Sequence, residues 1–545
     1  MVSVEVSKAF LLGASGCSES QLIEALPQIK CEVDSDENGV LRIEVTGDRP
    51  DLLSREGIAR ALRGWLNKET GLPEMKLSKS NYRMLVDASV SKIRPFIVCA
   101  FARGVSFKGD DIAELMQVQE KLTLTHGRRR RKVAIGIHDA NKIKPPFVYK
   151  AVAANEIAFV PLGKIQEMTP LKILEEHEKG REYAFALGKT GKYPIIFDST
   201  GEVVSFPPII NAARTTVTES TRDLFLDVTG TDFESCNVAL NILCQNYSDA
   251  GARIQSMEVH YPRKHNVVTP HTQPHVMTAD IAWINKNLGI DADSKFIIQA
   301  LERQRFNAQK QGAKIRCEIP RYRADFLHPI DLVEEVAIGI GYNNFEPKAP
   351  GTYTRGCRSE ESLLQDKVRD LVMGAGYLEL TTPVVSNEAI AAKSFSEKTL
   401  VKIRNPVSSD YSHLRSTLLP GLIEAVSRNT HNTYPQKIFE VGEVVACDEK
   451  KCERTRTDVH VACLTAHSES NLTESASVLK ELMNSLKMDF SLRKKNFKQF
   501  INGRSGFIDV AGNSIGVIGE VHPEVLENWG IHVPCSAFEI RLLEF

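Results

Sequence analysis

A segment beyond the middle of the chain predicts a helix with two faces of opposite character. Pro329 suits the first helical position, because an N–H there would have no partner inside the helix. Asp331, Glu334 and Glu335 follow at spacings i, i+3 and i+4, which places their carboxylates on one face. The opposite face is apolar and consists of Leu332, Val333, Val336 and Ile340. The segment must therefore pack against a domain core while it carries three negative charges elsewhere.

The acidic face has two explanations. Three carboxylates within one turn repel each other by about 0.2–0.5 kcal/mol per pair, and Asp325 lies just upstream and can join them. A hard, oxygen-seeking cation such as Mg²⁺ would turn this repulsion into attraction. Acidic residues near a helix N-terminus are also favoured by the helix dipole without any metal. The residues alone leave both explanations open.

Length, charge and cysteine usage limit the kind of protein that carries this helix. A chain of 545 residues is several times the usual domain size, so two to four domains are expected. Lys and Arg total 68 against 69 Asp and Glu, which argues against a general nucleic-acid coat or a polybasic membrane binder. The 11 cysteines include no C-x-x-C pair, which argues against a zinc ribbon and favours a reducing, cytoplasmic location. No uncharged stretch approaches ~18 apolar residues, so no membrane span is predicted.

Changes in periodicity divide the chain into four regions. Residues 1–80 read as strand, helix, strand, helix and predict an N-terminal α/β domain. Residues 82–262 are rich in short β segments and predict an α+β domain. Residues 263–349 predict a small helical domain with helices over 279–288 and 294–306, a strand over 314–319 and the two-faced helix. Residues 355–545 predict a complete α/β or α+β domain, so the fold class is multidomain α+β.

Local signals mark expected boundaries in the first eighty residues. A first helix should end at Pro27, and a second helix, capped by Asp51 or Ser54, should stop at Gly64. The polar run 76–81 reads as a linker to the second region.

A run of basic residues lies between a predicted helix and a predicted strand in the second region. It consists of Arg128, Arg129, Arg130, Arg131 and Lys132. In a chain of almost no net charge, such a loop either presents cations to phosphates or is simply solvated. The two interpretations are equally open.

Small polar residues further along the second region are candidates for a pocket between hairpins. They include Ser205, Asn211, Asp227 and Thr229. Turn and capping chemistry is the default explanation for such side chains. Neither G-x-x-x-x-G-K-[ST] nor a convincing G-x-G-x-x-G is present, so any ATP chemistry does not use a P-loop.

Several motifs, in order along nearly the whole chain, resemble one known family. They are GDRPDLL at 47–53, IRPF at 93–96, AIGIHD at 134–139, FPPIIN at 206–211, VTGTD at 228–232, IPRYRAD at 319–325, GYNN at 341–344 and RSTLLPGL at 415–422. Their order and spacing resemble the β subunits of phenylalanyl-tRNA synthetases of the archaeal and eukaryotic type. The resemblance implies an α₂β₂ cytoplasmic ligase that uses ATP to join phenylalanine to tRNA(Phe), releasing AMP and diphosphate.

The resemblance also implies roles for three of the regions. Residues 263–349 would form a winged-helix-like domain whose Asp325, Asp331, Glu334 and Glu335 bind a Mg²⁺ ion shared with the α subunit. Residues 355–545 would form an antiparallel-sheet domain like that of class II aminoacyl-tRNA synthetases. The arginine expected after 438–444 is absent, because the chain continues Val-Ala-Cys, and 519–523 lacks a Gly-rich segment ending in arginine. Adenylation is therefore expected in the α subunit.

Residues 82–262 would form the editing domain of the family and a tRNA-binding module. An apolar pocket that accepts phenylalanine rejects an added hydroxyl only about 10²-fold, so tyrosine is sometimes attached and must be removed. The resemblance implies Ser205, Asn211, Asp227 and Thr229 as editing-pocket residues, with a substrate-positioned water as the expected nucleophile. The basic run 128–132 is the candidate for tRNA contact.

Two other functions remain as alternatives: a free-standing deacylase of mischarged tRNA, and a non-enzymatic RNA-binding scaffold. The synthetase-like last region favours the ligase subunit, because a free-standing deacylase would not need a surface for subunit association.

Overall fold

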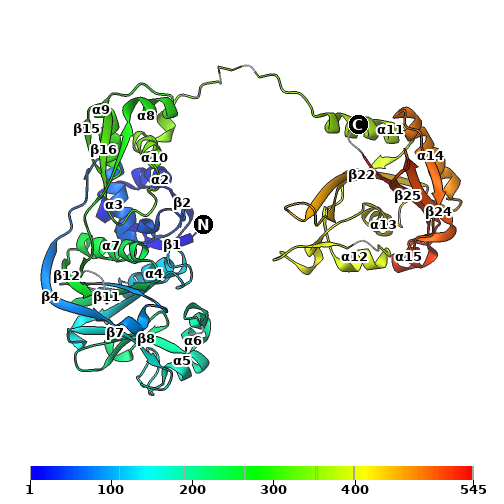
Figure 1. Cartoon of the computed structure of the whole chain (residues 1–545). Helices are drawn as coiled ribbons and strands as arrows, with labels where there is room; N and C mark the ends of the chain where they lie inside the picture. The colour runs from blue at the N-terminus through cyan, green and yellow to red at the C-terminus, as the bar shows by residue number, and fades with distance from the viewer. Residues whose placement is uncertain are drawn as a thin grey trace. The chain divides into compact units, whose positions relative to one another are not determined.

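The computed structural model describes residues 2–109, 111–188, 191–262, 266–349, 351–352, 354–396 and 399–542. The chain forms two compact units, Met1–Lys348 and Ala349–Phe545 (Figure 1). None of the helices in the described residues has the length and apolar character needed to cross a membrane.

The first unit begins with a small α/β layer pair. Its sheet has the antiparallel order β1-β3-β2. The elements are β1 (Val2–Ser7), α1 (Lys8–Ser15), α2 (Glu19–Gln28), β2 (Cys31–Glu37), β3 (Val40–Val45) and α3 (Arg55–Trp65). Ser54 caps α3, as its spacing predicted, by accepting a hydrogen bond from the Gly57 N–H. The boundary predicted at Pro27 is wrong: this residue lies inside α2, where its missing N–H affects only the last turn.

The stop predicted at Gly64 is also wrong, because α3 continues through it to Trp65. A Cβ at Gly64 would lie 2.3 Å from the carbonyl oxygen of Arg303, so the glycine serves a close approach to the third region of the chain. The Arg303 guanidinium donates to the Trp65 carbonyl, with Nη2 at 2.7 Å, and to the Gly339 carbonyl. One cation thus joins the C-terminal ends of two helices from different regions.

A ten-stranded mixed sheet forms the largest layer of the first unit. Its order is β10-β9-β8-β7-β4-β12-β5-β11-β6, with β13 paired to β12. The strands are β4 (Leu77–Val86), β5 (Phe96–Arg103), β6 (Val133–Asp139), β7 (Phe147–Ala153), β8 (Lys192–Phe197), β9 (Val203–Phe206), β10 (Ile210–Asn211), β11 (Asp223–Gly230), β12 (Arg253–His260) and β13 (Val267–Thr269). The helices are α4 (Asp111–Leu124), α5 (Pro170–Glu176), α6 (Glu178–Tyr183) and α7 (Phe233–Asp249).

The linker predicted over 76–81 is wrong, because β4 begins at Leu77 and pairs in parallel with β12. The first residues of β4 are polar. Backbone hydrogen bonds to β12, rather than apolar side chains, hold them in the sheet. The hydroxyl of Ser78 donates to the Ile254 carbonyl, 3.2 Å away, and that of Ser80 donates to the Ser256 carbonyl.

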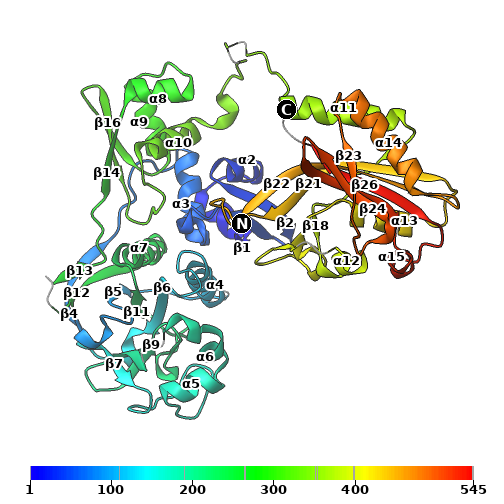
Figure 2. The same ribbon diagram turned by 45° about the vertical axis from the view of Figure 1, so that its right-hand side comes forward.

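The third region adds three helices and a three-stranded antiparallel sheet, so its description as a helical domain is incomplete. The sheet order is β14-β16-β15. The elements are β14 (His275–Asp280), α8 (Ile281–Leu288), α9 (Ser294–Arg303), β15 (Asn307–Gln311), β16 (Lys314–Ile319) and α10 (Pro329–Ile340). The helix predicted from residue 279 begins at Ile281, since Ala279 and Asp280 belong to β14. In Figures 1 and 2 the N-terminal layers lie between this region and the ten-stranded sheet.

The second unit is built on a seven-stranded sheet of order β17-β21-β22-β26-β25-β24-β23. Neighbouring strands are antiparallel except β17 and β21. The strands are β17 (Leu378–Glu379), β21 (Gln436–Cys447), β22 (Thr455–Ala466), β23 (Ser491–Lys494), β24 (Phe500–Val510), β25 (Asn513–Val521) and β26 (Cys535–Arg541), and β18 (Val385–Ser386), β19 (Val401–Lys402) and β20 (His413–Leu414) form a second small sheet. The helices are α11 (Glu360–Gly374), α12 (Glu388–Lys393), α13 (Leu419–Arg428), α14 (Leu472–Ser485) and α15 (Pro523–Asn528).

Candidate functional site

A pocket of about 310 Å³ lies beside β6 and β11 in the first unit. Its walls come from α4, β6, the β9–β10 hairpin and β11. Strands β6 and β11 are direct neighbours in the sheet (Figure 2). The structure brings together here all four predicted pocket residues, Ser205, Asn211, Asp227 and Thr229, and adds Arg130 from the basic run. Leu115, Met116, Ile135 and Ile209 supply much of the apolar lining. The pocket therefore combines an apolar body with a few polar groups, the usual make-up of a small-ligand site.

Asp227 is held by a buried histidine that the sequence analysis did not single out. His138 Nε2 and Asp227 Oδ2 are 2.8 Å apart, and His138 Nδ1 lies 2.8 Å from the Thr215 hydroxyl. That hydroxyl donates to the Ala212 carbonyl, so it must accept from Nδ1. A second proton then lies between Nε2 and the carboxylate, which fixes the orientation of both side chains.

A glycine makes this contact sterically possible. Gly136 faces Asp227 across the β6–β11 ladder. A Cβ at Gly136 would lie 2.0 Å from Asp227 Oδ2 and 2.7 Å from His138 Nε2. No side chain larger than hydrogen fits there while the carboxylate reaches the imidazole.

Ser205 and Asn211 form a second polar pair on the facing hairpin. They are cross-strand partners in β9 and β10, and the Ser205 hydroxyl donates to Asn211 Oδ1 at 3.1 Å. Asn211 Nδ2 donates to the Ile137 carbonyl at 3.3 Å. The amide is therefore oriented from both ends, yet Asn211 remains half-exposed toward the pocket.

Thr229 has a different setting from the other three. Its hydroxyl accepts a hydrogen bond from Arg94 Nε at 2.9 Å, and its carbonyl accepts one from Arg94 Nη2 at 2.6 Å. Arg94 is buried, and its Nη1 donates to the Arg130 carbonyl at 3.0 Å. Thr229 thus links the pocket to the basic run.

The basic run folds into a tight turn, here called the basic turn (residues 128–132). Arg128, Arg129 and Arg130 all have left-handed backbone conformations, with φ of 50°, 53° and 64°. Arg130 points inward: its Nη1 donates to the Pro208 and Ile209 carbonyls, and its guanidinium lies 3.9 Å from the Tyr183 ring centroid. Burial lowers the pKa of Arg130.

The other cations of the basic turn lie nearer the surface. Arg128, Arg129 and Arg131 are exposed, and Arg129 and Arg131 lie over Phe185 at 5.2 Å and 4.8 Å from its centroid. Lys132 Nζ is 3.6 Å from an Asp232 carboxylate oxygen. Two arginines beside an aromatic ring, and the exposed Arg128, therefore flank the pocket residue Arg130.

The predicted magnesium carboxylates lie in the third region, and each has a protein partner. Arg323 Nη2 lies 2.6 Å from Glu335 Oε1 and 2.6 Å from Asp325 Oδ2. Asp331 accepts hydrogen bonds of 2.7 Å from the backbone N–H groups of residues 327 and 328, which makes it part of a capping box at the start of α10. Glu334 forms an ion pair of 3.0 Å with Lys30.

Comparison with known sequences assigns three of the four regions. Residues 106–243 match the profile of the B3/4 domain, residues 277–342 that of the tRNA synthetase B5 domain, and residues 346–542 that of the phenylalanyl tRNA synthetase beta chain CLM domain. The chain is 41% identical over 535 residues to the phenylalanine--tRNA ligase beta subunit of Archaeoglobus fulgidus, which covers 97% of this chain and 96% of that protein. The chain belongs to the family of phenylalanine--tRNA ligase β subunits. The family resemblance read from the motifs is thereby confirmed.

Further relatives agree with this assignment to the phenylalanine--tRNA ligase β subunits. The beta subunit of Pyrococcus abyssi is 39% identical over 521 residues, covering 94% of this chain and 93% of that protein. An N-terminal fragment of the phenylalanyl-tRNA synthetase beta subunit from Pyrococcus horikoshii, solved by crystallography, superposes with a TM-score of 0.60 at 37% identity, covering 62% of this chain and 99% of that one. The chain is thus a ligase subunit of multidomain α+β architecture with B3/4, B5 and CLM domains.

In this β subunit the carboxylates do not fit a single four-ligand Mg²⁺ site. Although burial raises the pKa of Asp325, the charge of Arg323 outweighs it and lowers this pKa to about 2. Asp325 and Glu335 are therefore neutralised by a buried arginine, and a second cation beside Arg323 would be repelled. Within the described part of the chain, no group of three or more acidic, histidine or cysteine side chains is arranged to hold a metal. The magnesium site stays a prediction.

His138 is the functional candidate that sequence reasoning missed. It stands in the AIGIHD motif that supported the family resemblance, and it shares a strand face with Gly136. A polar residue two positions from a glycine in an otherwise apolar strand was the available signal. Its partner Asp227 lies 89 residues away, and only the β6–β11 pairing brings the two together.

Proposed function

We propose that this chain acts with an α subunit in an α₂β₂ ligase that attaches phenylalanine to tRNA(Phe), using ATP and releasing AMP and diphosphate. Identity to named β subunits over nearly the whole chain supports this. The CLM domain carries no arginine in the Val-Ala-Cys segment that ends β21, so adenylation belongs to the α subunit. Free cysteines throughout the described residues are compatible with a reducing cytoplasm.

The pocket of the B3/4 domain removes tyrosine that has been attached to tRNA in error. The observation that carries this proposal is the convergence of two oriented polar pairs on one apolar pocket, Ser205 with Asn211 and Asp227 with His138. The apolar lining accepts an aromatic ring. The Asn211 amide, held by its two neighbours, is placed to bind a phenolic hydroxyl, which tyrosine has and phenylalanine lacks.

Asp227 is the group suited to hold the aminoacyl end of the substrate. His138 occupies its Oδ2, while Oδ1 accepts no hydrogen bond within the part of the chain that the structure describes. A buried carboxylate oxygen facing a pocket binds an ammonium group strongly. In hydrolysis, a water oxygen bonds to the ester carbonyl carbon, the bond to the ribose oxygen breaks, and that oxygen takes up the proton. No protein nucleophile is required.

The basic turn holds the tRNA near this pocket. Arg128, Arg129 and Arg131 supply positive charge for phosphates, and Phe185 supplies a ring on which a terminal base can stack. Arg130 faces inward instead and carries the hairpin that bears Asn211.

Purification of the chain with its α subunit tests the proposal. The complex should charge tRNA(Phe) with phenylalanine in an ATP-dependent reaction and should hydrolyse added tyrosyl-tRNA(Phe). The β chain alone should form no aminoacyl-adenylate. Charging by the β chain alone, or a complex that leaves tyrosyl-tRNA intact, would contradict the proposal.

A further inference from the structure

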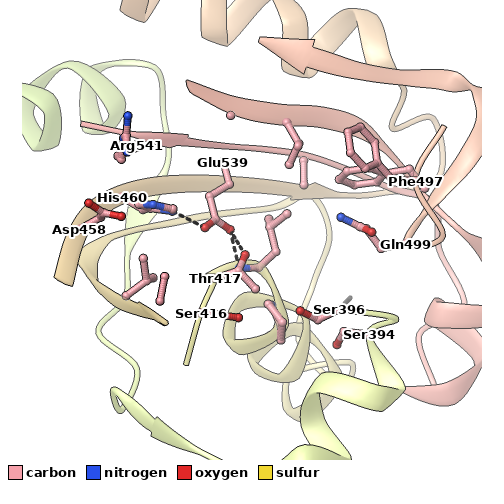
Figure 3. A pocket seen from close by; sticks show the side chains of 18 of the residues that line it. Ser394, Ser396, Ser416, Thr417, Asp458, His460, Phe497, Gln499, Glu539 and Arg541 are labelled. Carbon is pink, nitrogen blue, oxygen red and sulfur yellow. Dashed lines mark hydrogen bonds and ion pairs between the residues drawn. The ribbon is translucent and has the colours of Figure 1, made fainter. Parts of the chain in front are cut away.

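A second cavity, of about 450 Å³, lies within the CLM domain. One wall is the face of the seven-stranded sheet formed by alternate residues of β22 and β26, and α13 closes it from below in the view of Figure 3. The cavity belongs entirely to the second unit and shares no residue with the pocket of the B3/4 domain. Its volume lies in the range of small-molecule sites.

One end of the cavity is aromatic. Phe497 packs edge-on against Phe507, with ring centroids 5.0 Å apart and planes at 89°, and against Phe500 at 6.3 Å. All three rings line the cavity, and Figure 3 shows Phe497 at the end away from Arg541. A planar apolar group is the ligand part that such an end accommodates.

The carboxylate in the middle of the cavity is already satisfied. Glu539 Oε1 lies 2.6 Å from His460 Nδ1. Its Oε2 accepts hydrogen bonds from the Thr417 hydroxyl and from the backbone N–H groups of residues 418 and 419, at 3.0 Å and 3.2 Å. This carboxylate fixes the start of α13 and does not call for a cationic ligand.

The other end of the cavity carries an excess of available positive charge. Arg456 is paired with Asp458, with Nε 2.8 Å from Oδ2. Arg541 follows Glu539 on the same face of β26 and has no hydrogen-bond or ion-pair partner among the described residues. Of the described charged groups in the lining, Arg541 is therefore the one free to bind a ligand, and it selects for an anion.

We infer that this cavity binds a small aromatic carboxylic acid, with the ring among the three phenylalanines and the carboxylate on Arg541. Residues 537 to 541 extend about 13 Å along β26 at the usual strand rise, so a spacer of several atoms separates ring and carboxylate. This site lies in the CLM domain, and its ligand binding does not depend on the proposed editing activity of the B3/4 pocket.

Binding of matched probes to the full-length β chain tests this inference. Isothermal titration calorimetry compares three probes: 4-phenylbutanoate, 4-phenylbutylamine and butanoate. The amine keeps the ring but is positively charged, and butanoate keeps the carboxylate but has no ring. We expect the aromatic acid to bind at least about tenfold more tightly than either of the others. Equal binding of the amine, or no binding of the acid at millimolar concentration, would overturn the inference.

Three variants locate the site. Arg541→Gln should weaken 4-phenylbutanoate at least about tenfold, and because Arg541 has no described partner, the variant should keep its melting temperature. Arg504→Gln, which removes an arginine paired with Glu520 in the same sheet but outside the cavity, should leave binding unchanged. Asn211→Ala in the B3/4 pocket should also leave it unchanged. Binding that survives Arg541→Gln, or disappears in Asn211→Ala, would refute the assigned site.

Discussion

His138 Nε2 lies 2.8 Å from Asp227 Oδ2, and neither side chain has more than 2% of its surface exposed. A charged or proton-sharing pair at this depth persists only when each partner's remaining hydrogen-bonding groups are satisfied or face a ligand. Thr215 satisfies the imidazole, and the pocket receives the free carboxylate oxygen. The pair therefore leaves one carboxylate oxygen facing the pocket, where we propose that a ligand binds.

Replacing Asp227 should separate editing from charging. Asp227→Asn keeps the shape but removes the charge that binds the ammonium group, so hydrolysis of tyrosyl-tRNA(Phe) should slow by about 10–100-fold. Charging with phenylalanine by the αβ complex should be unchanged. Asp223→Asn is the matched control, because Asp223 lies on the same strand but pairs with Arg103 outside the pocket. Equal hydrolysis rates in the two variants would show that Asp227 does not take part in editing.

A methyl group at Gly136 should damage both stability and editing. Gly136→Ala places a carbon against the Asp227 carboxylate, and such overpacking costs about 1–3 kcal/mol. Urea unfolding measures the loss, and tyrosyl-tRNA hydrolysis should fall with it. Gly13→Ala is the control, since its added Cβ would meet nothing within 4 Å and it lies inside α1. A Gly136→Ala protein with wild-type stability and hydrolysis would show that the close approach does not matter.

Charge reversal on the basic turn should weaken tRNA binding in a salt-dependent way. Arg129→Glu with Arg131→Glu removes two cations from the face of the turn, so the slope of log K against log salt should become shallower by about 0.7–0.9 for each phosphate that is no longer neutralised. Filter binding across a salt series measures the slope. Arg42→Glu, another exposed arginine of the first unit, serves as the control. Identical slopes for the wild type and both variants would show that the basic turn is a solvated loop that does not bind phosphates.

Removing Arg323 should reveal how the buried carboxylates depend on it. Arg323→Met leaves Asp325 and Glu335 without their counter-charge, which should lower the free energy of unfolding at pH 7 by about 3–5 kcal/mol. The pKa of Asp325 is about 2, below its ordinary 3.8. Its ion pair therefore stabilises the wild type above about pH 4, and this contribution is lost as the pH falls toward 2.

The stability difference between wild type and Arg323→Met should consequently shrink on acidification, as followed by urea unfolding from pH 7 to pH 3. Arg321→Met is the control, because Arg321 makes a peripheral ion pair of 3.7 Å with Glu234, donates to the Gln273 carbonyl and contacts neither Asp325 nor Glu335. A difference that stays constant across this pH range would show that Arg323 does not stabilise ionised carboxylates.

Periodicity predicted the elements whose burial alternates or repeats clearly. The two-faced helix became α10, which begins at Pro329 as predicted and ends at Ile340. Polar strands were missed, as at the start of β4 and in β15, because their backbone ladder rather than apolar side chains holds them.

The site was predictable only in part, for a similar reason. The four pocket residues were named from their motifs, but His138 and the inward turn of Arg130 follow from pairings between segments far apart in sequence. The carboxylates of α10 occupy the predicted positions on the helix. Arg323, the partner of Glu335, lies in the IPRYRAD motif, yet spacing alone does not show whether an arginine folds back onto a helix.

The bridge that Arg303 makes between Trp65 and Gly339 has a consequence for how the first unit opens. Two helix ends that share one donor cannot fray independently, so amide hydrogens of α3 and α10 should exchange with solvent in a single cooperative event. Segments far apart in the chain would then be one unit of folding, and a fragment that kept the first eighty residues without the B5 domain would lose the support of both.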